Sequence, residues 1–375
     1  FRPNKEANRT HSKGYVEDRG HSAGKKRCAK MVVLNLSVLP KHRKGRERLL
    51  KKKLSVLLLC MVCALLTACS IPKAAEEKPA AYTVTDIEGT VVDFPAPPQR
   101  IVTLSMSTDE TMLGLVEPER IVAVNGLLDD PVSSNVTALV KDIPQRIGNP
   151  SVEEIMALQP DLVVVPDWGD LTIVPSLREA GLRVIVCKGA SNLAEIRDTV
   201  TLLAAAAGEP ERGQKLLAMM DEKLAEIEAK VEKIPQAERK RVVLISLMGG
   251  YGGLGSSFDE ACRYAGVING RAELGIRDFQ VMTKEQLVQI DPDILFLPTY
   301  NDRGKYDVDA FRRDYLGDPS LQTMKAIRSK AFAEPFEGYI YNCSQDFVFG
   351  VQEIAYRVYG DDFKQGEDEH LSAVK

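Results

Sequence analysis

Histidine is nearly missing from most of this 375-residue sequence. Three of its four histidines, His11, His21 and His42, lie within the first 69 residues, and only His370 lies in the remaining chain. That part of the chain therefore has almost no means to build a histidine base, a histidine-rich metal site or a histidine haem ligand. Whole-chain disorder is also excluded, because 44% of the residues are hydrophobic and 27% are charged, as in an ordinary globular protein. The length suits two packed domains.

Cysteine is scattered and offers no disulfide framework. Four of the seven cysteines lie in the first 69 residues. The other three form no C-x-x-C motif and are Cys187, Cys262 and Cys343. A single bridge between Cys262 and Cys343 remains open, but three buried free thiols are the simpler expectation.

Acidic residues are scarce at the start of the chain, whereas basic residues are outnumbered by acidic ones in the rest of it. Residues 1–69 carry 17 Lys and Arg against 4 Asp and Glu, whereas residues 70–375 carry 32 against 49. Binding to nucleic acid needs a basic face on the folded part. The acidic body therefore argues against a nucleic-acid partner.

The first 69 residues resemble a leader for export. A basic run at 41–53 precedes 15 uncharged apolar residues, which are too few to span a bilayer but suit a signal peptide. The run ends in Leu66-Thr67-Ala68-Cys69, which resembles the lipobox of bacterial lipoproteins. That resemblance makes Cys69 the lipid anchor, although a plain secretory signal is the alternative. Residues 1 to about 40 look like an over-extended reading frame or a long basic start.

The chain beyond the leader alternates short apolar runs with helical patterns. Four such runs are 101–104, 121–124, 162–165 and 184–187. This alternation is typical of parallel strands in an α/β domain. A long amphipathic stretch begins at Pro210 and stops at Pro235, after which strands resume at 242–247. We therefore predict a leader at 1–69, a tether at 70–81, an N-terminal lobe at 82–208, a linker helix at 209–236, a C-terminal lobe at 237–363 and an acidic tail at 364–375.

An internal repeat supports two related lobes. Residues 151–166 align without gaps on residues 283–298, and each copy reads as a capped helix, a Pro-Asp turn and a buried strand. In each copy a hydroxyl residue is followed three positions later by Glu or Gln, which predicts a capping box.

Glu153 and Glu285 occupy the second helical position of the two repeat copies and have no capping role. An acid there is favourable beside the positive end of a helix, which is explanation enough for a purely structural residue. Equivalent carboxylates at equivalent points of two lobes are also what docking onto a two-fold symmetric partner requires. Both interpretations remain open from the residues alone.

Four segments, together with the long helix predicted from Pro210, resemble the ferric-siderophore and cobalamin group of substrate-binding proteins of ABC importers. They are Arg100-Ile-Val-Thr-Leu-Ser105, the block from Gly148 to Val164, Gly255 to Asn269, and Lys284-Glu-Gln-Leu287. The resemblance covers about residues 82–363. It implies two Rossmann-like lobes with parallel sheets joined by one long α-helix, and a ligand held in the cleft between them. It also implies that Glu153 and Glu285 meet arginine pockets on the membrane permease, which works with its ATPase, and that the protein is a monomer.

A glycine-rich loop at 250–255 matches the dinucleotide fingerprint G-x-G-x-x-G, which favours an alternative, a nucleotide-binding α/β enzyme. Against it, the loop follows an export leader and no acid clearly ends a following strand to hold a ribose. Small residues that let the backbone line a cleft are the better interpretation.

The ends of the predicted strands supply the candidate ligand-binding residues. They are Ser105, Ser107, Asn125, Trp168, Tyr251, Leu254, Tyr300, Arg303 and Arg313. Trp168, the only tryptophan, would pack on a macrocycle or a siderophore backbone. The arginines would suit an anionic ferric chelate through charge-assisted hydrogen bonds.

The first hypothesis is therefore an extracytoplasmic, lipid-anchored receptor that delivers a ferric siderophore to an ABC importer, with no catalysis and no cofactor or metal bound by the protein itself. Cobalamin is the alternative ligand, followed by haem, for which a tyrosine would replace the missing histidine. A protein-coordinated zinc or manganese site is disfavoured because histidines are missing. The enzyme, and an adhesive lipoprotein with a filled cleft, are the alternatives from other classes.

Overall fold

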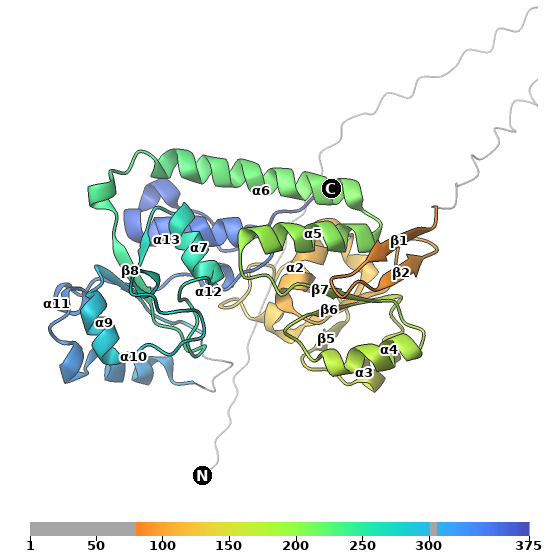
Figure 1. The fold of residues 1–375 in the computed structure, drawn as a ribbon, viewed down its shortest axis with the longest axis horizontal. Coiled ribbons are helices and arrows are strands. Elements are labelled where there is room, and N and C mark those ends of the chain that lie inside the picture. Colours follow the sequence, from red (N-terminus) through yellow and green to blue (C-terminus); the bar gives the residue numbers. More distant parts are fainter. Residues whose placement is uncertain (1–79, 301–305, 375) are drawn as a thin grey trace, which may run out of the picture. The chain divides into compact units, whose positions relative to one another are not determined.

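Two parallel sheets organise the chain. The computed structural model describes residues 80–300 and 306–374 (Figure 1). The first sheet has the order β5-β4-β3-β6-β7 and every pairing in it is parallel. Its strands are β3 (Ile101–Thr103), β4 (Ile121–Asn125), β5 (Gln145–Ile147), β6 (Leu162–Pro166) and β7 (Val184–Cys187). The strands β3, β6 and β7 are buried along their whole length, as expected where helices cover both faces.

The helices of this N-terminal lobe follow its strands in alternation. They are α2 (Met106–Leu115), α3 (Val152–Ala157), α4 (Val174–Glu179) and α5 (Leu193–Ala207), with 3₁₀ turns η1 (Pro118–Arg120), η2 (Gly126–Asp129) and η3 (Leu171–Ile173). An antiparallel hairpin of β1 (Tyr82–Thr85) and β2 (Val91–Phe94) precedes them. The predicted α/β alternation is confirmed in this half of the chain.

The C-terminal lobe repeats the plan with a smaller sheet in the order β11-β10-β8-β9, again all parallel. Its strands are β8 (Arg241–Leu244), β9 (Ile268–Asn269), β10 (Ile294–Phe296) and β11 (Phe332–Ala333). Its helices are α7 (Ser257–Tyr264), α8 (Gly270–Glu273), α9 (Lys284–Ile290), α10 (Val308–Leu316), α11 (Lys325–Ser329), α12 (Glu337–Ile340) and α13 (Phe347–Tyr359), with 3₁₀ turns η4 (Gln236–Glu238), η5 (Pro319–Leu321) and η6 (Asp361–Phe363).

The helix α6 (Pro210–Val231) joins the two lobes (Figure 1). Proline occupies its first position, where the missing N–H costs nothing. At 1.5 Å per residue its 22 residues span about 33 Å. A buried stripe that includes Leu216, Met220 and Leu224 packs on α2 and α5 of the first lobe and on α7 and α13 of the second. The predicted fold of two α/β lobes and one connecting helix is therefore confirmed.

The last segment of the chain returns from the C-terminal lobe to the first. The Ala373 N–H donates to the Gly114 carbonyl of α2 at 2.8 Å, and the Leu371 N–H donates to Asp346 Oδ1 at 2.9 Å. Within the segment predicted as an acidic tail, 364–375, residues 364–374 form a strap that crosses between the lobes, because backbone groups of this segment find partners there.

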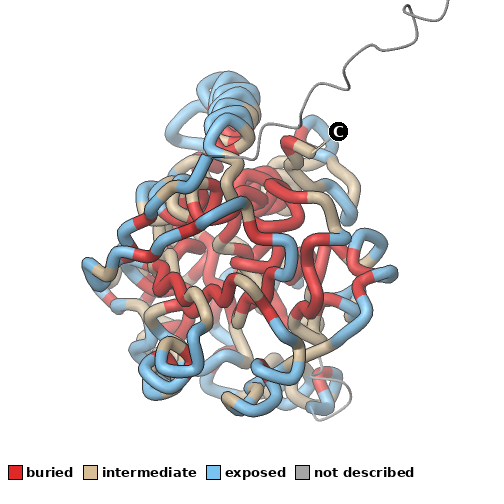
Figure 2. The backbone as a smooth tube through the Cα atoms, turned by 90° about the vertical axis from the view of Figure 1, so that its right-hand side faces the viewer, coloured by how far each residue is buried: buried red, intermediate tan, exposed pale blue. Residues whose placement is uncertain are grey.

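The hydrophobic core is continuous through both lobes. Its main cluster joins Ile101 of β3, Leu216 of α6 and Phe347 of α13. Buried residues fill the interior while exposed ones form the outer surface (Figure 2). Cys187 and Cys262 are buried and Cys343 is half-buried, and all three are free thiols. No bridge therefore joins Cys262 to Cys343.

Candidate functional site

Two adjoining cavities form a cleft between the lobes, at the carboxyl ends of the strands. One has a volume of about 320 Å³ and the other about 470 Å³. They share three lining residues, Ser107 from α2 and Met248 and Tyr341 from the C-terminal lobe. This is the place where open parallel sheets bind ligands.

The serines of the first lobe reach the cleft because α2 begins where β3 ends. The Ser105 hydroxyl accepts from the Thr108 N–H at 3.3 Å and so caps the helix. Ser105 lines the larger cavity and Ser107 lines both. These two candidates from the sequence therefore lie in the cleft.

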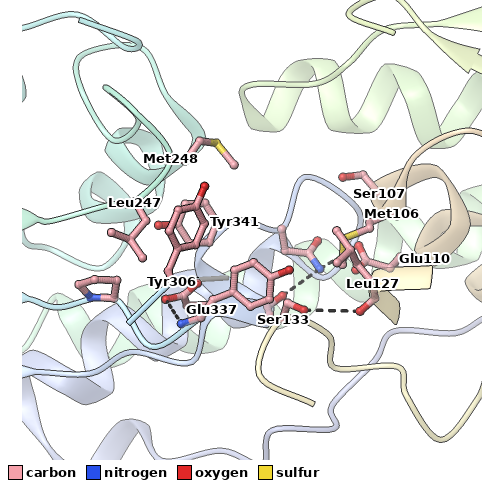
Figure 3. A pocket seen from close by; sticks show the side chains of 14 residues that line it. Met106, Ser107, Glu110, Leu127, Ser133, Leu247, Met248, Tyr306, Glu337 and Tyr341 are labelled. Carbon is pink, nitrogen blue, oxygen red and sulfur yellow. Dashed lines mark hydrogen bonds between the residues drawn. The ribbon is translucent and has the colours of Figure 1, made fainter. Parts of the chain in front are cut away.

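The smaller cavity lies between two walls, one from each lobe (Figure 3). The wall from the N-terminal lobe consists of Met106, Ser107, Glu110, Leu127 and Ser133. The opposite wall consists of Leu247, Met248, Pro298, Tyr300, Tyr306, Glu337, Gly338, Tyr341 and Asn342. Thioether, aliphatic and phenol groups predominate, with a few polar groups that can orient a ligand.

Glu110 is a buried carboxyl at this cavity, with 2% of the residue exposed. Its Oε2 accepts from Asn342 Nδ2 at 2.9 Å, so the bond joins the two lobes (Figure 3). Burial, with the Asp346 carboxylate as a second cause, raises the pKa of Glu110 well above its ordinary value. Burial therefore favours the protonated form of this carboxyl, which can donate as well as accept a hydrogen bond.

Glu337, on the opposite wall, holds the backbone that follows β10. Its Oε1 accepts from the Thr299 N–H at 2.5 Å and from the Tyr300 N–H at 2.9 Å. Tyr300 was a candidate from the sequence and lines the smaller cavity. The acid thus fixes the loop that carries this phenol.

Asn125 is not among the residues that line either cavity. Its side chain accepts from the Leu127 N–H at 2.9 Å and caps η2, while its own N–H donates to Asp109 Oδ2 at 2.7 Å. Burial raises the pKa of Asp109 to about 8. The neighbouring Leu127, and not the predicted Asn125, lines the cleft wall.

Trp168 lines the larger cavity and is 68% exposed. It follows β6, and Gly189 leaves room for its ring, since a Cβ on Gly189 would lie 1.8 Å from Trp168 Cδ1. Beside it, Lys188 Nζ pairs with Asp167 Oδ2 at 2.8 Å. That pairing offsets the positive charge of the one Lys or Arg among the described residues that line the two cavities.

Tyr251 also lines the larger cavity, but only 7% of the residue is exposed. Its hydroxyl donates to the Ile340 carbonyl at 3.1 Å and lies 2.8 Å from Ser257 Oγ. Burial raises the pKa of Tyr251 well above its ordinary value. Its phenol is therefore a neutral group held in place by the C-terminal lobe.

The glycine-rich loop 250–255 packs on the segment 276–280. The Gly252 N–H donates to Asp278 Oδ1 at 3.0 Å and the Leu254 N–H donates to the Ile276 carbonyl at 2.7 Å. A Cβ on Gly253 would lie 2.4 Å from the Arg277 carbonyl oxygen. These glycines permit a close backbone approach, and amides that would cradle a phosphate already have partners. Leu254 is 44% exposed and lies outside the lining of both cavities.

The basic residues expected in the cleft are not gathered there. Arg313 lies on α10, is exposed and is not among the lining residues. Its neighbour Arg312 donates from both Nε and Nη2 to the Pro298 carbonyl, at 2.8 and 2.5 Å. Arg303 and Cys69, the predicted lipid anchor, lie outside the described residues. Among the described residues no group of three or more His, Cys, Asp or Glu could hold a metal ion.

Sequence reasoning missed several cleft residues. They are Glu110, Met248, Phe279, Glu337 and Tyr341. Glu110 lies on α2, the helix that follows β3, and could have been found by extending the search from the strand end along this helix. Phe279 and Tyr341 lie in turns and short helices far from any strand end, where the sequence carries no signal.

Glu153 and Glu285 are exposed second residues of α3 and α9. Both predicted capping boxes are present, formed by Ser151 with Glu154 and by Thr283 with Gln286. A bond from its own backbone N–H, with the Thr283 hydroxyl as a second cause, lowers the pKa of Glu285. Glu285 therefore presents an ionised carboxylate at neutral pH.

Comparison with known proteins agrees with this geometry. The sequence pattern of the periplasmic binding protein family matches residues 101–334. The chain belongs to this family. The resemblance drawn from the sequence is thereby confirmed.

Two relatives illustrate the range of the family. The cobalamin-binding protein of Halobacterium salinarum is 26% identical over 240 residues, which are 63% of this chain and 61% of that protein. This chain thus spans about three-fifths of that relative's length. The probable siderophore-binding lipoprotein YfiY of Bacillus subtilis is 23% identical over 75% of this chain and 89% of its own.

The solved structures share the fold. The periplasmic heme-binding protein RhuT from Roseiflexus sp. RS-1, in apo form, aligns with a TM-score of 0.60 at 22% identity. The alignment covers 71% of this chain and 99% of that protein. Within residues 80–300 and 306–374, no helix has the length and apolar character required to cross a membrane.

Proposed function

We propose that this protein captures an iron(III)–siderophore complex outside the cytoplasm and delivers it to the permease of an ABC importer. The cleft carries this proposal, because two cavities lined by both lobes lie at the strand ends, where a family member would hold its ligand. Cys69 would carry the lipid anchor at the membrane surface. The protein itself would catalyse no reaction and would ligate no metal, since the iron arrives within its chelate.

The two helix-terminal acids support delivery to a permease. Glu153 and Glu285 are exposed, occupy equivalent positions in the two lobes, and are not needed for the capping boxes beside them. Exposed carboxylates of this kind suit charge-assisted contacts with arginines on two related permease subunits.

A tetrapyrrole, cobalamin or haem, is the second candidate ligand. The specific observation that favours it is the composition of the smaller cavity, where Tyr300, Tyr306 and Tyr341 accompany two methionines and no Lys, Arg or His occurs among its described lining residues. Phenols and thioethers suit a large apolar ring better than they suit a polyanionic chelate. A tyrosine could serve as an axial ligand to haem iron.

Titration of the purified protein, followed by the fluorescence of its only tryptophan, Trp168, tests these proposals. The ligands are a ferric hydroxamate, a ferric catecholate, ferric citrate, cobalamin and haemin, with NADH as the control. Saturable binding of a ferric chelate at sub-micromolar concentration supports the first proposal, and binding of cobalamin or haemin alone supports the second. If neither the fluorescence titration nor isothermal titration calorimetry detects binding of any of the five ligands, both proposals are contradicted.

A further inference from the structure

The C-terminal lobe places a large, exposed aromatic side chain at the cleft. Phe279 lies in the turn between α8 and α9, lines the larger cavity, and is 68% exposed. Its φ of +59° is uncommon for a bulky residue. A phenylalanine that exposes most of its ring and adopts a strained backbone conformation gains nothing from burial in the folded protein itself.

Trp168 is the counterpart of Phe279 on the other lobe. It lines the same cavity and is also 68% exposed. Because Trp168 follows β6 of the N-terminal sheet and Phe279 precedes α9 of the C-terminal lobe, the two aromatic side chains belong to opposite walls of one cleft. Each lobe thus contributes one large, solvent-exposed aromatic ring to the cleft.

A glycine supports each of these two residues. A Cβ on Gly189 would lie 1.8 Å from Trp168 Cδ1 and 2.4 Å from Trp168 Nε1. A Cβ on Gly250 would lie 2.5 Å from the backbone carbonyl carbon of Phe279. The guanidinium of Arg271 fixes the same turn by donating to the Gly250 and Gln280 carbonyls at 2.6 and 2.7 Å. The ring of Trp168 and the backbone of Phe279 therefore each pack closely against a glycine of the same lobe.

We propose that Trp168 and Phe279 form an aromatic clamp that closes on the two faces of a ligand with an extended conjugated or aromatic surface. This inference rests on the proposed function and narrows its substrate class. Conjugated faces gain from packing on aromatic rings, whereas an aliphatic, polyanionic chelate such as ferric citrate does not. Met248, which is 52% exposed at the junction of the two cavities, adds a polarisable thioether to the same apolar surface.

Tetrapyrroles and tris-catecholate chelates share this conjugated surface, and direct binding distinguishes them. Calorimetry of the unsubstituted protein uses haemin, cobalamin, iron(III) tris-catecholate and iron(III) citrate. The clamp predicts tight binding of at least one of the first three and weaker binding of citrate. Tight binding of citrate alone would overturn the clamp and leave the proposed ferric-chelate function intact, whereas binding of none would overturn both.

Substitution then tests the two rings themselves. Trp168→Ala and Phe279→Ala are each expected to weaken binding of the preferred ligand about tenfold, because each removes one ring–ligand contact. Phe279→Tyr keeps a ring and should retain the affinity. Val281→Ala is the matched control, since Val281 is 74% exposed two residues from Phe279 and lies outside the cavity lining. Affinities within twofold of the unsubstituted protein in both alanine variants would overturn the clamp.

Gly189→Ala provides a test that keeps both rings. Its methyl group would displace the Trp168 ring, so we expect a shifted tryptophan emission and a loss of affinity close to that of Trp168→Ala. The double variant Trp168→Ala with Gly189→Ala should bind no more weakly than Trp168→Ala alone. A further loss in the double variant would show that Gly189 acts independently of the ring, against the clamp.

Discussion

Two adjacent acids at the start of α2 have different duties. Asp109 accepts from the Thr103 hydroxyl and from the Asn125 N–H, and so ties the ends of β3 and β4 together. Glu110 faces the smaller cavity and bonds to Asn342 of the other lobe. Both are buried, and burial raises the pKa of each carboxyl. The two side chains point in different directions from the same helical turn. Asp109 therefore holds two strands together, whereas Glu110 lines the cleft.

The raised pKa of Asp109 predicts a stability that falls as pH rises. Its pKa is about 8 in the folded state and about 3.9 in an unfolded chain. Between these values the folded state keeps a proton that the unfolded state has lost, so the free energy of unfolding decreases by at most about 1.4 kcal/mol per pH unit. Below the pKa of the unfolded chain both states carry the proton, so the stability no longer depends on pH through this group.

Asp109→Asn should therefore flatten the decline in stability between about pH 5 and pH 7. Urea unfolding at the two pH values measures it. Glu110 leaves a remaining decline of the same sign, because its pKa is also raised. Asp93→Asn, at an exposed position on β2, is the control and should keep the full slope. An unchanged slope in Asp109→Asn would show that this carboxyl is ionised in the folded protein.

At the scale of elements, α3 and α9 show how one short motif serves two purposes. The capping residues bond within their own helices, as Thr283 Oγ1 does with the Gln286 N–H at 3.2 Å. The adjacent acids, Glu153 and Glu285, are exposed. The repeat in the sequence therefore marks both the start of a helix and a surface carboxylate.

Thr283→Ala and Glu285→Ala should separate these purposes. Loss of the cap is expected to lower the free energy of unfolding by about 1 kcal/mol. Loss of the exposed acid should change the free energy of unfolding much less, because solvent screens its interaction with the helix dipole. Urea unfolding of both variants measures the difference. If Glu285→Ala costs as much as Thr283→Ala, Glu285 is a structural residue and its proposed docking role loses its basis.

At the scale of the whole molecule, α6 and the C-terminal strap connect the same two lobes. The core cluster is continuous through both lobes, and the strap adds backbone bonds such as Ala373 to Gly114. His370, the only histidine after residue 69, lies within the strap, and its Nδ1 is 2.7 Å from Asp346 Oδ2. The two lobes are therefore joined at two places, by α6 and by the strap.

Removal of residues 364–375 should lower the melting temperature by about 5 °C or more. The physical reason is that Asp346 and the Gly114 carbonyl would lose partners inside the protein. Calorimetry measures the melting temperature, and amide hydrogen exchange should show faster opening of α2. Glu367→Ala, an exposed position on the strap, is the control. An unchanged melting temperature would mean that the strap is dispensable for stability.

The proposed delivery to a permease can be tested on the whole molecule. Glu153→Ala with Glu285→Ala should reduce iron uptake by cells about tenfold or more, because two charge-assisted contacts are lost, while ligand affinity of the purified protein stays unchanged. Glu211→Ala is the matched control, since Glu211 is also an exposed acid in the first turn of a helix, α6. A collapse of ligand affinity in the double variant would instead place these acids in ligand binding.

Local patterns in the sequence determine the elements and their order. Apolar runs with intervening helical periods predict parallel strands, the stretch from Pro210 predicts α6, and the repeat predicts both capping boxes, because each depends on residues close together in the chain. Ser105, Ser107, Trp168, Tyr251 and Tyr300 lie in the cleft because they follow strands, whose ends share one edge of a sheet.

Tertiary structure alone decides which side chains meet across the lobes. Glu110 and Asn342 are 232 residues apart and form one hydrogen bond, and Trp168 and Phe279 line one cavity from opposite lobes. Leu254 lies outside the cleft because its loop packs on residues 276–280, although its sequence position follows a strand. Burial, cleft composition and the course of the strap follow from packing between distant segments, which no local pattern encodes.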